Sequence, residues 1–180
     1  PAIAEETEAG SSSNVEAEVT AVIQESAARW TAQESTSVLE LWDRDDPRPM
    51  YLAAERDDWL IGWEEVSNYI IPSGPNSALE AMRKRVSNIR VKQVAPDLAI
   101  ATWNMHLDMK FRGQLPIGNN IRLTGVLRKK PQGWRFIHYA EAPMTPLVYI
   151  RNFYQDDVEP EFQEVYESAL KKRANKGSPD

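Results

Sequence analysis

A chain of 180 residues is long enough to fold as one domain with a sizeable core. Its net charge of −6 argues against nucleic acid or an anionic membrane as the main partner, because both attract a positive surface. Without cysteine, the chain has no disulfide, thiolate nucleophile or cysteine-bound metal. No segment approaches the roughly 20 apolar residues of a membrane helix. The acidic start lacks the pattern of a secretory signal, and we therefore expect a cytoplasmic protein.

Helices are predicted in the first half of the chain. Residues 1–14 are mostly Glu, Ala, Gly and Ser, a composition that predicts a disordered arm. Apolar residues at three-to-four spacing then predict an amphipathic helix over 15–30. Shorter helices are expected at 37–42, at 63–70 and at 76–85.

Strands dominate from about residue 85, where the apolar period changes to two. We expect strands in the following segments: 50–52, 86–94, 98–111, 120–130 and 133–143. Tight turns join the later ones, which makes them antiparallel neighbours. Helices followed by an antiparallel meander predict an α+β fold, with helices on a curved sheet over 15–146. Residues 147–180 are expected to form an extension with a helix, as a lid or a dimer contact.

Three segments carry a resemblance to a known superfamily: LWDRDDPRPMYL at 41–52, GWEEVSNY at 62–69 and GWRFIHY at 133–139. In their order, the chain over about 15–145 resembles the nuclear-transport-factor-2-like superfamily, also called SnoaL-like. The resemblance implies a cone-shaped pocket and a homodimer or higher homo-oligomer. It also implies catalysis, where present, without metal or organic cofactor. Members range from isomerases, dehydratases and diaryl lyases to non-catalytic assembly modules, so the fold does not fix the function.

The strand at 98–111 carries the first candidate site. One face of it presents Asn104, His106 and Asp108, and the other face is apolar. Either the apolar face is core and the polar face solvated, or the polar face lines the pocket and the apolar face makes a dimer contact. The resemblance favours the second arrangement, because a pocket-lining position of similar proteins matches His106. We then expect His106 as general acid or base, with Asn104 and Asp108 contacting the substrate.

Two further candidates come from the last strand and the short strand at 50–52. Glu141, flanked by alanines, would be a carboxylate in an apolar wall and suited to proton transfer. Its alternative is an edge carboxylate paired with Arg122 or Arg135. Tyr51 could hydrogen-bond a substrate oxygen, as tyrosines do in the similar isomerase and dehydratase pockets, or pack on the core. His138 is expected to be structural, on the face opposite Glu141.

Three aspartates, Asp43, Asp45 and Asp46, follow the second predicted helix. They lack the ligand spacing and the glycine of a calcium loop, so solvation of a helix end is the plain interpretation and no metal site is expected. The resemblance nevertheless makes Asp45 a candidate catalytic residue. Four rings are expected in the pocket wall or the core: Trp30, Trp42, Trp63 and Tyr69.

Three functions follow from these observations. The first is a cofactor-independent lyase or isomerase for a bulky aromatic substrate. Loss of water or formaldehyde from a lignin-derived diaryl compound, as in the diaryl lyase branch, is an example. The second is a non-catalytic module that binds a small molecule, and the third is a structural subunit of an oligomeric complex. The chain lacks the spaced Asp and Tyr set of ketosteroid isomerase and the two pocket histidines of scytalone dehydratase, so neither of those reactions is predicted.

Overall fold

The computed structural model describes residues 3–71, 78–143, 163–168 and 171, with side chains from residue 14 onward. The chain divides into two units, Pro1–Met144 and Thr145–Asp180. In the second unit, residues 163–168 are helical. The rest of the predicted extension, and with it any role as a lid or dimer contact, lies outside the described residues.

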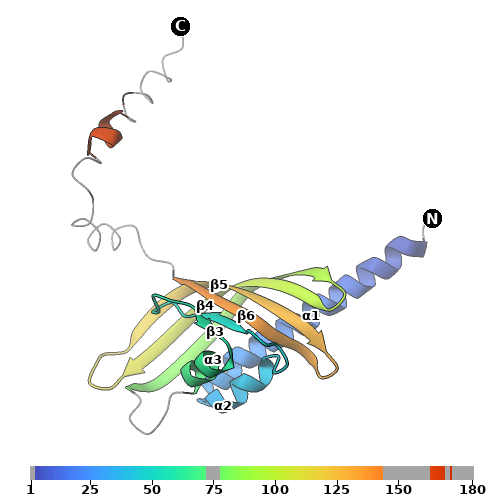
Figure 1. Ribbon diagram of the computed structural model, residues 1–180, viewed down its shortest axis with the longest axis horizontal. Coiled ribbons are helices and arrows are strands. Elements are labelled where there is room, and N and C mark those ends of the chain that lie inside the picture. The colour runs from blue at the N-terminus through green and yellow to red at the C-terminus, as the bar shows by residue number, and fades with distance from the viewer. Residues whose placement is uncertain (1–2, 72–77, 144–162, 169–170, 172–180) are drawn as a thin grey trace. The chain divides into compact units, whose positions relative to one another are not determined.

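Helices form one layer of the first unit (Figure 1). They are α1 (Ile3–Thr31), α2 (Ser35–Val38), the 3-10 helix η1 (Leu39–Leu41) and α3 (Trp63–Ile70). Val19 and Ile23 are buried on the face of α1 that meets the sheet, as the amphipathic spacing predicted. The helix begins at Ile3, inside the segment predicted to be a disordered arm, where Ala and Glu are strong helix formers.

A six-stranded sheet forms the second layer, in the order β2-β1-β6-β5-β4-β3. Its strands are β1 (Met50–Leu52), β2 (Leu60–Ile61), β3 (Leu79–Ala95), β4 (Leu98–Phe111), β5 (Ile117–Lys130) and β6 (Gly133–Pro143). Strands β3 to β6 form the predicted antiparallel meander, and β1 joins β6 in parallel. Helices packed on a sheet confirm the predicted α+β fold.

Strand β3 corrects one prediction. Residues 76–85 were expected to be helical, but β3 begins at Leu79 and pairs with β4 along most of its length. The segment is rich in Ala, Leu, Glu, Met, Arg and Lys, which favour helix in isolation. Pairing with β4 overrides that local preference. The correction matters because it turns Lys84 toward the helix layer, where it is buried.

Strand β6 contains an irregularity that decides which side chains meet the helices. Val126 pairs with His138 and Leu127 with Phe136, so Ile137 is an extra residue opposite β5. The bulge reverses the alternation of the strand. Phe136 and Tyr139, three residues apart, are therefore both buried, and Glu141 is buried with them. Strict alternation along the strand would place Phe136 on the face opposite Glu141.

Candidate functional site

A cavity of about 460 Å³ lies in the first unit. Its walls are largely apolar and come from α1, α3 and the sheet; the sheet supplies Leu79, Met82, Leu107, Met109, Phe111, Ile117 and Ile121. Three of its lining side chains are both polar and almost fully buried: Tyr51, Lys84 and Glu141. A cavity of this size and composition suits a small, mainly apolar ligand that is oriented by a few polar groups.

Glu141 and Tyr51 form a buried pair in the wall of this cavity. Parallel pairing of β1 with β6 places Tyr51 opposite Tyr139, two residues from Glu141. The Tyr51 hydroxyl donates to Glu141 Oε1 at 2.9 Å, and the Ala54 backbone N–H donates to Oε2 at 3.2 Å. These two donors hold the carboxylate in one orientation. Burial, together with the charge of Glu141, raises the pKa of Tyr51, so that its hydroxyl remains a donor at neutral pH.

Lys84 places an amine in the same cavity. Its backbone N–H donates to Thr31 Oγ1 at 3.0 Å, which fixes this point of β3 to the end of α1. The side chain is 8% exposed, and its Nζ lies 4.4 Å from the centre of the Trp30 ring. Among the described residues, no hydrogen-bond acceptor contacts the amine. Burial lowers the pKa of Lys84, although the charges of Glu141 and Glu55 oppose that shift.

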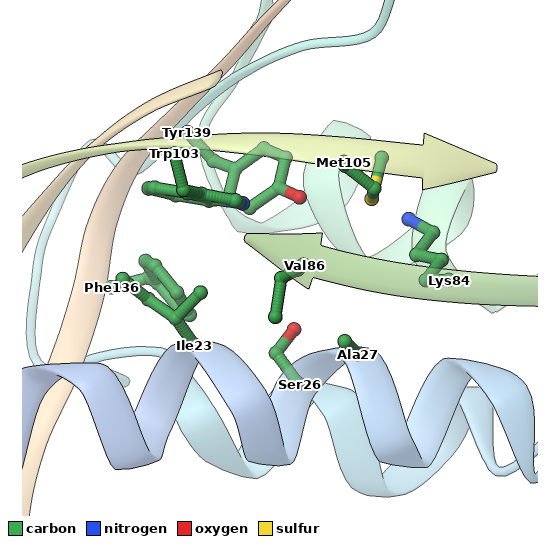
Figure 2. Close-up of a pocket in the computed structure, with 9 residues that line it drawn as sticks. All are labelled: Ile23, Ser26, Ala27, Lys84, Val86, Trp103, Met105, Phe136 and Tyr139. Atoms are coloured by element: carbon green, nitrogen blue, oxygen red, sulfur yellow. The ribbon is translucent and has the colours of Figure 1, made fainter. Parts of the chain in front are cut away.

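Figure 2 shows a gap in the core that Lys84 also lines, between α1 and strands β3, β4 and β6. The Lys84 side chain extends from β3 toward Met105, across from Ser26 and Ala27 of α1. This gap has no room for a water molecule. The larger cavity is therefore the place where solvent or a ligand can reach the amine.

Tyr69 of α3 lies beside this set. Its ring centre is 5.1 Å from that of Tyr51, and its hydroxyl donates to Glu55 Oε1 at 2.5 Å. Burial and this hydrogen bond raise the pKa of Tyr69. Both residues line the cavity, where Tyr69 limits the space available to a ligand.

The structure thus brings together four of the side chains singled out from the sequence: Tyr51, Glu141, Tyr69 and Trp30. Two of the predicted rings, Trp42 and Trp63, do not line the cavity. Trp42 is buried in the core with its ring centre 6.0 Å from that of Tyr51. Trp63 donates from Nε1 to the Asp46 carbonyl at 3.0 Å, and the Arg44 guanidinium covers its ring.

The predicted facing of β4 is corrected. Leu107 and Met109, on the apolar face of this strand, line the cavity, whereas His106 alternates to the other face. Asn104 and Asp108 share that outer face with His106. The reason is that the apolar face of α1 packs against the inner face of the sheet. Burying the apolar side chains of β4 there is more favourable than burying its polar side chains.

His106 belongs instead to a polar chain on the outer face of the sheet. Its Nδ1 lies 2.9 Å from Asn120 Oδ1, and its Nε2 lies 2.9 Å from Asp108 Oδ1. Arg83 donates to the other oxygen of Asp108 at 2.7 Å. Hydrogen bonds from Arg83 and then from His106 lower the pKa of Asp108. Each group of this chain has a protein partner, which fits a structural role.

Asp43, Asp45 and Asp46 form an acidic cluster that binds the hairpin between β5 and β6. Asp43 is almost fully buried and lies 3.1 Å from Arg128 and 3.2 Å from Lys130. Asp45 is exposed and pairs with Lys130 at 2.7 Å, and Asp46 pairs with Arg128 at 3.1 Å. Asp45 does not line the cavity. Arg128 and Lys130, at the end of β5, both bind this cluster.

Lys84 is the residue that sequence reasoning missed. Assigned to a helix, the segment at 76–85 gave no reason to consider its facing. The signal was present, since Met82, Lys84 and Val86 alternate with Arg83 and Arg85. Read at a period of two, this alternation places a lysine between two apolar residues on an inward face.

Among the described residues, no helix combines the length and apolar character needed to cross a membrane. Nor do these residues contain a group of three or more His, Cys, Asp or Glu side chains arranged to hold a metal ion.

Comparison with known proteins identifies the family. The family model of the SnoaL-like domain matches residues 19–146, and the chain belongs to this family. A search of curated proteins finds no match.

Solved structures share the fold. An NTF2-like protein with a cystatin-like fold from Novosphingobium aromaticivorans is 16% identical, with a TM-score of 0.62 over 83% of this chain and 95% of that one. Hexachlorocyclohexane dehydrochlorinase LinA-type3 from Novosphingobium barchaimii is 11% identical, with a TM-score of 0.58 over 72% and 86%. The CamKII hub homology domain of Chlamydamonas reinhardtii is 21% identical, with a TM-score of 0.56 over 72% and 98%. At such identities these similarities establish the fold alone.

Proposed function

We propose that this protein is a cofactor-independent lyase or isomerase that transfers protons on a bulky aromatic substrate, with Glu141, Lys84 and Tyr51 as its working groups. The observation that carries the proposal is the meeting, in one apolar cavity, of a buried carboxylate and a buried lysine side chain whose amine has no hydrogen-bond acceptor among the described residues. Buried ionisable groups in a cleft are typical of catalytic sites. The dehydrochlorinase among the similar structures is an elimination enzyme by its name, which supports the same class of reaction.

The roles follow from the contacts. Glu141 accepts a proton from a carbon atom of the substrate, while Tyr51 and the Ala54 N–H hold it in place. Lys84 donates a proton to the leaving oxygen, or a hydrogen bond to an oxygen on which negative charge develops. Its lowered pKa makes the ammonium a better acid near neutral pH. Loss of water is then balanced: one proton leaves carbon for Glu141, and another moves from Lys84 to the departing hydroxyl.

A binding module without turnover is the second candidate. It is favoured by the fact that both oxygens of Glu141 already accept a hydrogen bond, so that a lone pair must be freed before either oxygen can take a proton from a substrate. In that function the same cavity would bind the aromatic ligand and Lys84 would only donate to it. Assembly into a homo-oligomer, proposed from the superfamily resemblance, is compatible with either candidate.

A screen of the purified protein separates the two. Aromatic dimers, steroids and polyketide-like phenols are added without metal or cofactor, and both the melting temperature and the product masses are measured. The proposal expects a product whose mass shows the loss of water, formaldehyde or another small group, or an isomer resolved by chromatography. A raised melting temperature with no product across the panel would contradict turnover and favour the binding module.

A further inference from the structure

Lys84 differs from the other lysines whose contacts the structure describes. Lys110 donates to the carbonyls of Phe111 and Gln114, and Lys130 to Asp45 and Asp43. Lys129 pairs with Glu18. The side chain of Lys84, by contrast, is buried, and its amine borders a cavity with no acceptor among the described residues. Burying a lysine side chain without an ion-pair partner costs free energy, so a role in holding the fold together does not explain it.

The surroundings of this amine make its uncharged form more common than it is for an exposed lysine at the same pH. Its walls are apolar, the neighbouring gap excludes water, and burial lowers its pKa. An uncharged amine has a free electron pair and attacks the carbon of an aldehyde or ketone. The Trp30 ring at 4.4 Å limits the space of the side chain and keeps the amine at the cavity wall.

We infer that Lys84 binds aldehydes and ketones covalently, as an imine, in the cavity that it shares with Glu141 and Tyr51. The inference rests on the proposed function in so far as this cavity is the ligand site, and it adds the chemical class of the ligand: an aromatic carbonyl compound. The apolar walls accept the rings, and the carbonyl carbon lies against the amine.

The step balances without a further reactant. The electron pair of Nζ forms a bond to the carbonyl carbon as the second bond of C=O breaks toward oxygen. Nitrogen then loses two protons in turn, which Glu141 carries to this oxygen. The first makes the oxygen a hydroxyl, and the second lets it depart as water while the C=N bond forms. The products are an imine and one water molecule. Once protonated, the imine nitrogen accepts the electron pair of a neighbouring C–H or C–C bond, which would assist the proposed proton transfer and loss of formaldehyde.

Reductive trapping tests the inference directly. The full chain is incubated with biphenyl-4-carbaldehyde near neutral pH, reduced with sodium cyanoborohydride, and analysed by intact mass and peptide mapping. The mapped adduct is expected at Lys84, at a rate at least about tenfold above that of the exposed Lys92, because the cavity holds the aldehyde beside the amine. Equal labelling of Lys84 and Lys92, or none at Lys84, would overturn the inference.

Matched variants make the assignment specific. Lys84→Met, which keeps the length of the side chain, is expected to remove the fast adduct, whereas Lys110→Met is expected to retain it. The comparison of Lys84 with Lys92 is internal to the wild type, so it stands even if a variant folds poorly. Turnover of the screened compounds without trapping would overturn the imine alone. Trapping without any product would leave the imine intact and contradict the lyase.

Discussion

At the scale of single residues, Lys84 shows how the cavity departs from a plain core. A lysine between Met82 and Val86 on the inward face of β3 lowers the free energy of unfolding unless its charge is compensated. The Trp30 ring and the distant charge of Glu141 compensate only in part, since the net shift of the Lys84 pKa is downward. Groups retained at such a cost are concentrated in functional sites.

The first prediction follows from this cost. Lys84→Met should raise the free energy of unfolding at pH 7 by about 1 kcal/mol or more, because methionine needs no solvation. Since the folded pKa of Lys84 is lowered, the unfolded wild type binds more protons as the pH approaches about 10.4, the ordinary lysine value. The free energy of unfolding of the wild type should therefore increase relative to that of the variant as the pH rises. Denaturant unfolding across the alkaline range measures this, and a pH-independent difference would contradict the burial of the amine.

Tyr51 gives the second prediction. Tyr51→Phe removes a hydroxyl that donates to a buried carboxylate at 2.9 Å, so the free energy of unfolding should fall by about 1.5–3 kcal/mol. The control is Tyr69→Phe, whose partner Glu55 is exposed and can be hydrated, and its loss should stay below about 1 kcal/mol. If urea titrations show that both variants lose the same free energy of unfolding, the hydrogen bond to Glu141 stabilises the fold no more than the one to Glu55.

At the scale of elements, the acidic cluster joins the segment after η1 to the β5–β6 hairpin. Asp43→Asn leaves Arg128 and Lys130 without their buried partner and should cost about 2 kcal/mol at pH 7, less than a fully buried pair because Arg128 is partly exposed. Asp45→Asn, at an exposed position, should cost less than about 0.5 kcal/mol.

The pH dependence of the Asp43 variant has a definite sign. Although burial acts to raise it, hydrogen bonds from the Asp45 N–H, Lys130 and Arg128 hold the pKa of Asp43 below its ordinary value. Its contribution to stability is therefore complete above about pH 3.9 and is lost as the pH falls through the folded pKa. The difference between wild type and Asp43→Asn should shrink in acid. A difference that grows in acid would contradict the ion pairs.

Packing between β4, β5 and β6 supplies the fourth prediction. A Cβ at Gly125 would lie 3.0 Å from Trp103 and 3.3 Å from Phe136, both buried and unable to move far. Gly125→Ala should therefore lower the free energy of unfolding by about 1–2 kcal/mol. Gly118→Ala on the same strand meets only ordinary contacts, the nearest at 3.4 Å, and should be nearly neutral in thermal unfolding. A stabilised Gly125→Ala would show that the Trp103 ring has room to shift.

Some of the strands could be predicted from the sequence, whereas the start of β3 and the bulge in β6 could not. The meander was predictable, because β4 and β5 alternate clearly and the turns between strands are short. The start of β3 was not, since its local helix preference is overridden only by pairing with β4. The bulge at Ile137 leaves no mark on the alternating pattern, yet it places Phe136 and Glu141 on one face. Tyr51 and Glu141 could be singled out, but their contact depends on the parallel pairing of β1 with β6.

At the scale of the whole first unit, the helix layer and the curved sheet create the cavity, and the family supplies the fold but not the reaction. The buried polar side chains of the cavity come from three strands that meet the helix layer: Tyr51 on β1, Lys84 on β3 and Glu141 on β6. The outer face of β4 carries a second polar set around His106, closed on its own partners. A function located in the cavity requires Lys84 and Glu141, whereas a function located on the outer face requires His106.

One kinetic comparison tests the central claim most directly. On the substrate identified by the screen, kcat is measured for the wild type, Glu141→Gln, Lys84→Met and His106→Gln. Both cavity variants should lose at least about 100-fold in kcat, the scale of a lost general acid or base. The outer-face variant His106→Gln should stay within about twofold of the wild type, because no reacting group is removed. Loss of turnover in His106→Gln, with Glu141→Gln and Lys84→Met still active, would contradict the assignment of the site to this cavity.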